Sequence, residues 1–201
     1  MQRQFASIVI ALGLLAAACG GDSGNDIDLS ADPGPIDTTL ISVPPETLGN
    51  EHVQPPVTFA QSPSIGGDHL SFWQNCGFYD VEVIEGAATH TLEHGAIWIT
   101  FNPERTSDAQ RAELAAMAQD NPRLLISPYP HIERIVLSGW GVQQRTDAVP
   151  GDAVVAEFIE QWQDGEGAPE SGVTCEGAVG VPPDGPTLFP GGQELPEDQF
   201  N

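Results

Sequence analysis

Histidine is concentrated in one part of this sequence, and imidazole is the commonest metal ligand in proteins. Four of the five histidines fall between residues 52 and 94, in a stretch that is predicted to be mostly loop. Loops held on a scaffold are where functional side chains concentrate. The paired glycines before the second histidine allow the backbone to turn its ring inward. We therefore predict a metal site whose ligands are His69, His90 and His94, with His52 as a fourth.

The closest spacing is in the run His90-Thr-Leu-Glu-His94. On a helix, residues four apart share one face and lie about 5–6 Å from each other. On a strand, the same two imidazoles would be about 13 Å apart, too far for one ion. The metal hypothesis thus requires a short helix over 86–94, and Gly95 is the residue type that commonly ends one. We interpret Glu93 as a partner that orients a ligand ring, with a ligand or an exposed helix residue as alternatives.

The same five residues match the motif of the inverted zincin peptidases, in which two histidines hold zinc and the glutamate is the general base. A zinc-dependent hydrolase with Glu93 as its base is therefore an alternative function. A third possibility is a non-catalytic surface binding module whose histidines form a structural network. The pattern leaves open whether the protein is an enzyme. The fifth histidine, His131, is interpreted as structural, and the four tryptophans as core residues.

Residue types also narrow the choice of metal. Apart from Met1, the only methionine is Met117, so a methionine-rich Cu(I) site is disfavoured. Imidazole with carboxylate suits Cu²⁺ or Zn²⁺. The acidic stretches lack the spacing of a calcium-binding loop and are predicted to be solvated surface.

The charge of the chain excludes several classes of partner. It contains 29 acidic and 6 basic residues, for a net charge of −23. All basic residues are arginine, so mechanisms that need a lysine are ruled out. Such a chain repels phosphate backbones, and we predict no nucleic-acid partner. An anionic membrane surface is equally unfavourable for the folded part.

The N-terminus resembles a bacterial export signal. Residues 1–18 combine a charged start with an apolar run too short for a permanent span, and they end in Leu-Ala-Ala-Ala before Cys19. This ending resembles a lipobox, which predicts that Cys19 is lipidated and that the protein is anchored on the extracytoplasmic face. An ordinary cleaved signal is the alternative. The membrane is then contacted through the lipid alone, and the sequence identifies no protein partner.

Export places the remaining cysteines in an oxidising compartment. If Cys19 carries lipid, Cys76 and Cys175 remain, and an even number predicts one disulfide. The alternative makes Cys76 a thiolate metal ligand or a nucleophile.

The organisation of the chain is that of one domain with two tails. Residues 19–50 are predicted to be a disordered tether and 176–201 a disordered acidic tail, because both are rich in Gly, Pro and acidic residues. Between them, 51–175 is predicted to be a single globular domain. Strands are expected at 80–84, 96–101, 124–126 and 135–140, and amphipathic helices at 107–119 and 151–163. The predicted fold is α+β, with a small, mostly antiparallel sheet, two helices on one face and a long histidine-bearing loop.

The motifs together resemble a known bacterial family, domain of unknown function 3105. Its pattern has a His before a Pro-Val pair, a Gly-x-His, a Gly-x-Tyr and a His-x-Leu-Glu-His-Gly. These pieces are matched here by His52, His69, Gly77 with Tyr79, and 90–95. The resemblance covers about residues 50–140 and implies an exported or membrane-tethered protein, but it supplies no activity.

Overall fold

A computed structural model of the chain describes residues 38–185, 188–189 and 193–194. The predicted signal at 1–18, the lipidation site Cys19 and the tether up to residue 37 lie outside these residues. The described helices are α1 (Glu85–Glu93), α2 (Asp108–Asp120) and α3 (Ala153–Trp162), with a 3-10 turn, η1, at Pro45–Thr47. The described strands are β1 (Thr38–Ser42), β2 (Gly77–Phe78), β3 (Ile97–Phe101), β4 (Leu124–Pro128), β5 (Ile135–Gly139), β6 (Val142–Thr146), β7 (Leu188–Phe189) and β8 (Gln193–Glu194).

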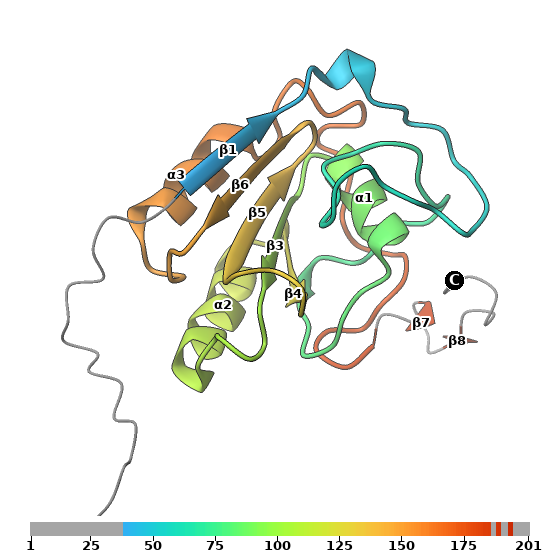
Figure 1. The fold of residues 1–201 in the computed structure, drawn as a ribbon. Coiled ribbons are helices and arrows are strands. Elements are labelled where there is room, and N and C mark those ends of the chain that lie inside the picture. The colour runs from blue at the N-terminus through green and yellow to red at the C-terminus, as the bar shows by residue number, and fades with distance from the viewer. Residues whose placement is uncertain (1–37, 186–187, 190–192, 195–201) are drawn as a thin grey trace, which may run out of the picture. The chain divides into compact units, whose positions relative to one another are not determined.

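The main sheet has six strands in the order β1-β6-β5-β3-β4-β2 (Figure 1). β1, β6, β5 and β3 pair antiparallel in turn, whereas β3 with β4 and β4 with β2 are parallel. The α+β class was thus predicted correctly, but the sheet is mixed. The difference arises because α2 connects β3 to β4 as a crossover, which makes these two neighbours parallel. A separate antiparallel pair is formed by β7 and β8.

The two faces of the sheet are covered by different helices (Figure 1). Ile97, Ile99 and Phe101 of β3 pack in one apolar cluster with Leu114 of α2 and with residues of α3. Trp98, between them in sequence, packs in a second cluster with residues of α1. Because side chains alternate along a strand, β3 separates these two layers. α1 and the loops around it therefore lie on the face opposite α2 and α3.

Most predicted elements are present with small shifts at their ends. The helix predicted at 107–119 is α2, and Ser107 caps it in a capping box with Gln110. The strand predicted at 80–84 is wrong. Val83 and Ile84 pack into apolar clusters beside α1 instead of pairing with a strand, because the chain leaves the sheet edge after Phe78.

The two-residue strands β2, β7 and β8 and the longer strands β1 and β6 were not predicted. β6 reads Val-Gln-Gln-Arg-Thr, which shows no strand pattern, and it forms because a tight turn at Gly141 (φ +76°) folds it back on β5. β1 lies within the predicted tether, and its five residues pair with β6, so that β1 forms the edge of the sheet. This part of the tether prediction is therefore wrong, because the sheet edge supplies backbone partners that the sequence does not reveal.

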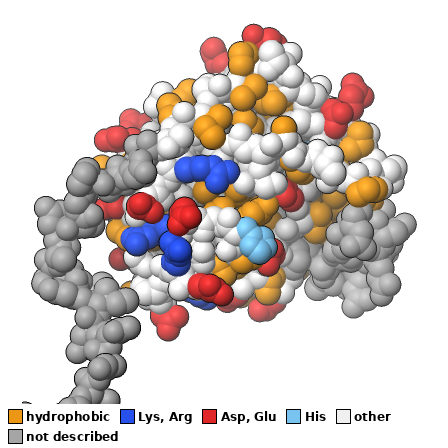
Figure 2. Space-filling view, viewed as in Figure 1, with side chains coloured by type: hydrophobic (Ala, Val, Ile, Leu, Met, Phe, Trp, Pro, Cys, Tyr) orange, Lys and Arg blue, Asp and Glu red, His pale blue; other side chains and the backbone are white. Residues whose placement is uncertain are grey.

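The predicted disorder after Cys175 is also wrong for the described residues 176–185. Val179 is fully buried, and it exchanges backbone hydrogen bonds with the loop that contains Trp73 and Asn75. Such pairing satisfies backbone groups that composition alone would assign to solvent. None of the helices among the described residues is long and apolar enough to span a membrane. Acidic side chains are dispersed over the face seen in Figure 2, as predicted for solvated charges.

Candidate metal centre

α1 presents the polar side chains of the predicted motif on a buried helix. His90, Glu93 and His94 are at most 3 % exposed. The helix ends as predicted, because Gly95 takes a left-handed conformation with φ +88°. A Cβ on this glycine would also come within 3.1 Å of Asp164, so the turn allows a second segment to pack against the end of α1. The rings of His90 and His94 have centroids 4.9 Å apart.

A short bridge between two distant loops brings His52 to His69. The two residues form an isolated parallel β-bridge, in which the Val53 amide donates to the His69 carbonyl over 2.8 Å. Gly66 and Gly67 precede it with φ values of +131° and +118°, a region that L side chains rarely adopt. The His69 ring is fully buried as a result, in agreement with the predicted role of the paired glycines.

The imidazoles of His52, His69 and His90 pack against one another. The His90 ring stacks on His52 at a centroid distance of 4.7 Å and lies 4.7 Å from the His69 ring. The His52 and His69 rings are 5.2 Å apart. One ligand atom from each of these three histidines and one from Glu93 lie within 4.8 Å of one another. We call these four residues the inner group, and their spacing is suitable for holding a metal ion.

Three imidazoles are oriented by hydrogen bonds to backbone carbonyls. His69 Nδ1 bonds to the carbonyl of Gly67 over 2.8 Å, and His90 Nδ1 to that of Leu70 over 2.8 Å. His94 Nδ1 bonds to the carbonyl of Thr174 over 2.7 Å. A carbonyl oxygen only accepts, so Nδ1 carries the hydrogen and the Nε2 lone pair of each neutral ring is free. This arrangement is typical of histidines that bind metal through Nε2.

His69 Nε2 is a buried polar atom without a hydrogen-bond partner among the described residues. A Glu93 carboxylate oxygen lies 3.0 Å away, and both side chains are at most 3 % exposed. Two atoms that offer electron pairs at this separation repel each other unless a proton or a metal ion lies between them. Two ligands bonded at about 2.0–2.2 Å to one ion, at about 90–110°, would lie about 3–3.4 Å apart. Glu93 is thus buried beside the histidines, which rules out an exposed helix residue and leaves the ligand and orienting roles.

A second group was not predicted from the sequence. His90, His94 and Glu170 also place ligand atoms within 4.8 Å of one another, and we call them the outer group. Glu170 Oε2 lies 3.4 Å from His94 Nε2, and its side chain is 48 % exposed. The sequence analysis placed Glu170 near the end of the predicted globular domain and gave it no role. Its proximity to Cys175 was the only signal, because a disulfide to Cys76 brings this stretch to the histidine loop.

The segment that carries Glu170 is bound along the end of α1. The Glu170 amide donates to the Glu93 carbonyl over 3.0 Å, and the Gly172 amide donates to the His94 carbonyl over 3.1 Å. Arg123 donates to the carbonyls of His94 and Val173, and it forms an ion pair with Asp164 at 2.6 Å. These contacts position the outer carboxylate beside His94.

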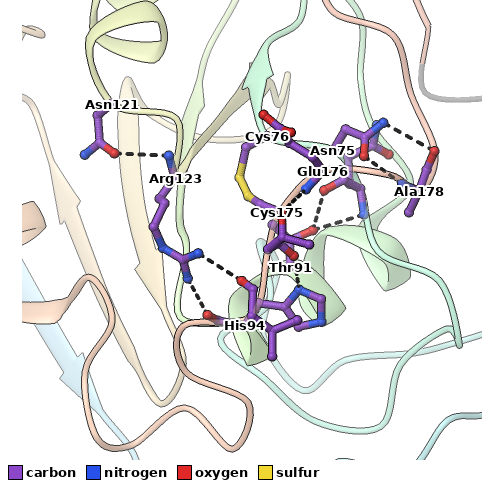
Figure 3. The surroundings of a disulfide bond; sticks show 12 residues. Asn75, Cys76, Thr91, His94, Asn121, Arg123, Cys175, Glu176 and Ala178 are labelled. Carbon is purple, nitrogen blue, oxygen red and sulfur yellow. Dashed lines mark hydrogen bonds between the residues drawn. A yellow bond between two sulfur atoms is a disulfide. The ribbon is translucent and has the colours of Figure 1, made fainter. Parts of the chain in front are cut away.

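The predicted disulfide between Cys76 and Cys175 is confirmed, with a Cα–Cα distance of 5.4 Å. Figure 3 shows it beside the His94 imidazole, between the chain that follows Asn75 and the chain that leads to Ala178. A bridge of this kind indicates an oxidising environment outside the cytoplasm. It also removes Cys76 as a thiolate ligand or nucleophile.

Burial keeps two of these histidines neutral. Desolvation is the largest cause that lowers the pKa of His90 to about 4; the hydrogen bond to the Leu70 carbonyl raises it in part, and the neighbouring imidazoles of His69, His94 and His52 lower it. Desolvation likewise lowers the pKa of His94. Both rings therefore offer a lone pair at neutral pH instead of competing for a proton.

The fifth histidine and the tryptophans can now be placed relative to the two ligand groups. His131 is exposed and belongs to neither group. Trp98 and Trp140 are buried as predicted. Trp73, predicted to be core, is only partly buried, and its ring lies 4.9 Å from that of His94 and 5.6 Å from that of His90. This tryptophan thus forms one wall of the outer group.

Comparison with known proteins bears on the family of this chain. A family model described as "Protein of unknown function (DUF3105)" matches residues 52–177, more than half of the chain. The matched range contains both ligand groups and both cysteines of the disulfide. The searches of curated proteins and of solved structures returned no match. The chain therefore belongs to the DUF3105 family.

Proposed function

We propose that this protein binds one divalent transition-metal ion, Cu²⁺ or Zn²⁺, on the extracytoplasmic face of the cell envelope. The observation that carries the proposal is the buried Nε2 of His69, which faces the Glu93 carboxylate at 3.0 Å without a hydrogen bond. The inner group supplies three imidazoles and one carboxylate, a donor set that both ions accept. The lipid anchor on Cys19 remains part of the proposal, and it would keep the metal site at the membrane surface.

The alternative, a non-catalytic module with a structural histidine network, accounts less well for these contacts. In a purely structural network each Nε2 would make a hydrogen bond, either to a donor or, when protonated, to the carboxylate, because an unsatisfied buried polar atom costs about 1–3 kcal/mol, whereas the buried Nε2 of His69 makes none within the described part of the chain. The Nε2 atoms of His69 and His94 instead face carboxylate oxygens. A metal ion would satisfy both atoms of each pair.

Metal analysis of the full chain, purified from an oxidising compartment, tests the proposal. After incubation with Cu²⁺ or Zn²⁺ and removal of free ion, we expect one ion per chain. The ion binds the folded chain only, so it should raise the melting temperature, and a chelator should lower it again. A chain that holds less than stoichiometric metal and melts at the same temperature with and without chelator would contradict the proposal.

A zinc-dependent hydrolase is the second candidate, and the outer group favours it. His90, His94 and Glu170 form a two-histidine, one-carboxylate set of the kind found in zinc peptidases, with the base candidate Glu93 in the same helix. The zinc-loaded chain should then cleave members of a peptide or ester library. Glu93→Gln should reduce this rate about 100-fold or more, since general bases contribute about 10²–10⁴. Cleavage that persists in Glu93→Gln, or no cleavage by the loaded chain, would reject this candidate.

A further inference from the structure

The two ligand groups share one ligand atom. His90 belongs to both groups, and its Nδ1 is bonded to the Leu70 carbonyl over 2.8 Å. Its only free ligand atom is therefore Nε2. Since Nε2 has a single lone pair, it completes either the inner or the outer group at any moment. The two positions are thus alternatives for one ion.

His90 lies between its two partners at nearly equal distances. Its ring centroid is 4.7 Å from that of His69 in the inner group and 4.9 Å from that of His94 in the outer group. The two groups differ instead in the exposure of their carboxylates. The side chain of Glu93 is 3 % exposed and that of Glu170 is 48 % exposed. An exposed carboxylate attracts a hydrated cation at little desolvation cost, whereas a buried one gains more once the ion has lost its water.

We infer that the outer group is the entry site, and that the ion passes from it to the inner group while His90 remains bound. This inference rests on the proposed function and adds a route to it. His94 and Glu170 are released as His69, Glu93 and His52 bind, so each ligand that leaves is replaced and the charge of the ion does not change. Because His90 is retained, the ion need not return to water during the exchange.

His52 is the competing route, since it is the exposed member of the inner group. The His52 ring, however, stacks on the His90 ring with an interplanar angle of 27°. It therefore covers the face of the His90 imidazole on the side of His52. If the ion entered directly past His52, the outer group would have no influence on the rate of loading.

Stopped-flow mixing of the full chain with Cu²⁺ tests the route. Intrinsic fluorescence follows the reaction, since Trp73 contacts both His90 and His94. Glu170→Gln should slow loading about tenfold, in the range by which local charge alters the association of ions. An entry site is only a stage on the route, so release to a chelator should slow by the same factor and the equilibrium affinity should not change.

Two further variants make the result decisive. Glu166→Gln removes the same charge from an exposed residue of the same segment and should leave both rates unchanged. His94→Asn keeps a donor for the Thr174 carbonyl while removing Nε2, and it should slow loading at least as much as Glu170→Gln. Unchanged rates in Glu170→Gln and His94→Asn, or two ions per chain at saturation, would overturn the entry site while leaving metal binding intact. Failure of the unsubstituted chain to bind metal would overturn both.

Discussion

Replacing His90 with asparagine is expected to abolish stoichiometric metal binding while the chain still folds. His90 is the one residue that both ligand groups require. Asparagine keeps a side-chain donor for the Leu70 carbonyl but has no atom at the position of Nε2. Loss of a partner outside the ligand shell already costs about 10–100-fold in affinity, so the loss of this ligand should exceed about 100-fold. Competition with a chelator of known affinity measures it.

His131→Asn is the matched control for this variant. It makes the same chemical change at an exposed histidine outside both groups, and metal affinity should stay at the level of the unsubstituted chain. Circular dichroism and the free energy of unfolding of the metal-free proteins show whether the folds are equivalent. A His90→Asn chain that is folded and binds one ion with unchanged affinity would refute the assignment of both groups.

Removing the disulfide with Cys76→Ser and Cys175→Ser should lower the free energy of unfolding of the metal-free chain more than any other substitution proposed for this protein. The two cysteines are separated by 99 residues, and a closed loop of this length is worth about 4–5 kcal/mol in the chain-entropy model. Cys175 follows Thr174, whose carbonyl orients His94, and Glu170 lies five residues earlier in the same segment. Metal loading should therefore slow together with the loss of stability, because the outer group loses its anchor.

Urea denaturation of the metal-free chains measures the first effect and stopped-flow loading the second. The unsubstituted chain treated with a phosphine reductant should reproduce both losses, whereas the same reductant should not change the doubly substituted chain. Equal free energies of unfolding with and without the bridge would contradict the stabilising role. Equal loading rates would show that the segment is positioned without it, by Arg123 and the backbone contacts to α1.

Local patterns predicted the parts of the site that depend on near neighbours in the chain. The spacing of His90 and His94 and the glycine that follows are sufficient for a helical turn with both rings close together, because helix geometry relates residues four apart. The paired glycines before His69 likewise predicted an inward ring. The cysteine count predicted the disulfide, since it required only the number of thiols and the compartment.

The spacing of residues in the chain could not divide the ligands into two groups. His52 reaches His69 through a bridge between loops, and Glu170 reaches His94 because a disulfide, Arg123 and backbone bonds bind its segment to α1. The strand β1 was missed for the same reason, because it pairs with β6, which is distant in the sequence. β6 was missed because its residues lack a strand pattern, although its partner β5 directly precedes it in the chain.

The sequence by itself thus determined the residue types of a candidate metal site, its helix, the disulfide and the mixture of helices and strands. Only the tertiary structure decided which carboxylate faces which imidazole, and that His90 is shared. Sequence patterns report contacts over three or four residues, where backbone geometry is regular. Contacts between distant segments depend on the packing of the whole domain, and here this packing determines where the free Nε2 atoms point.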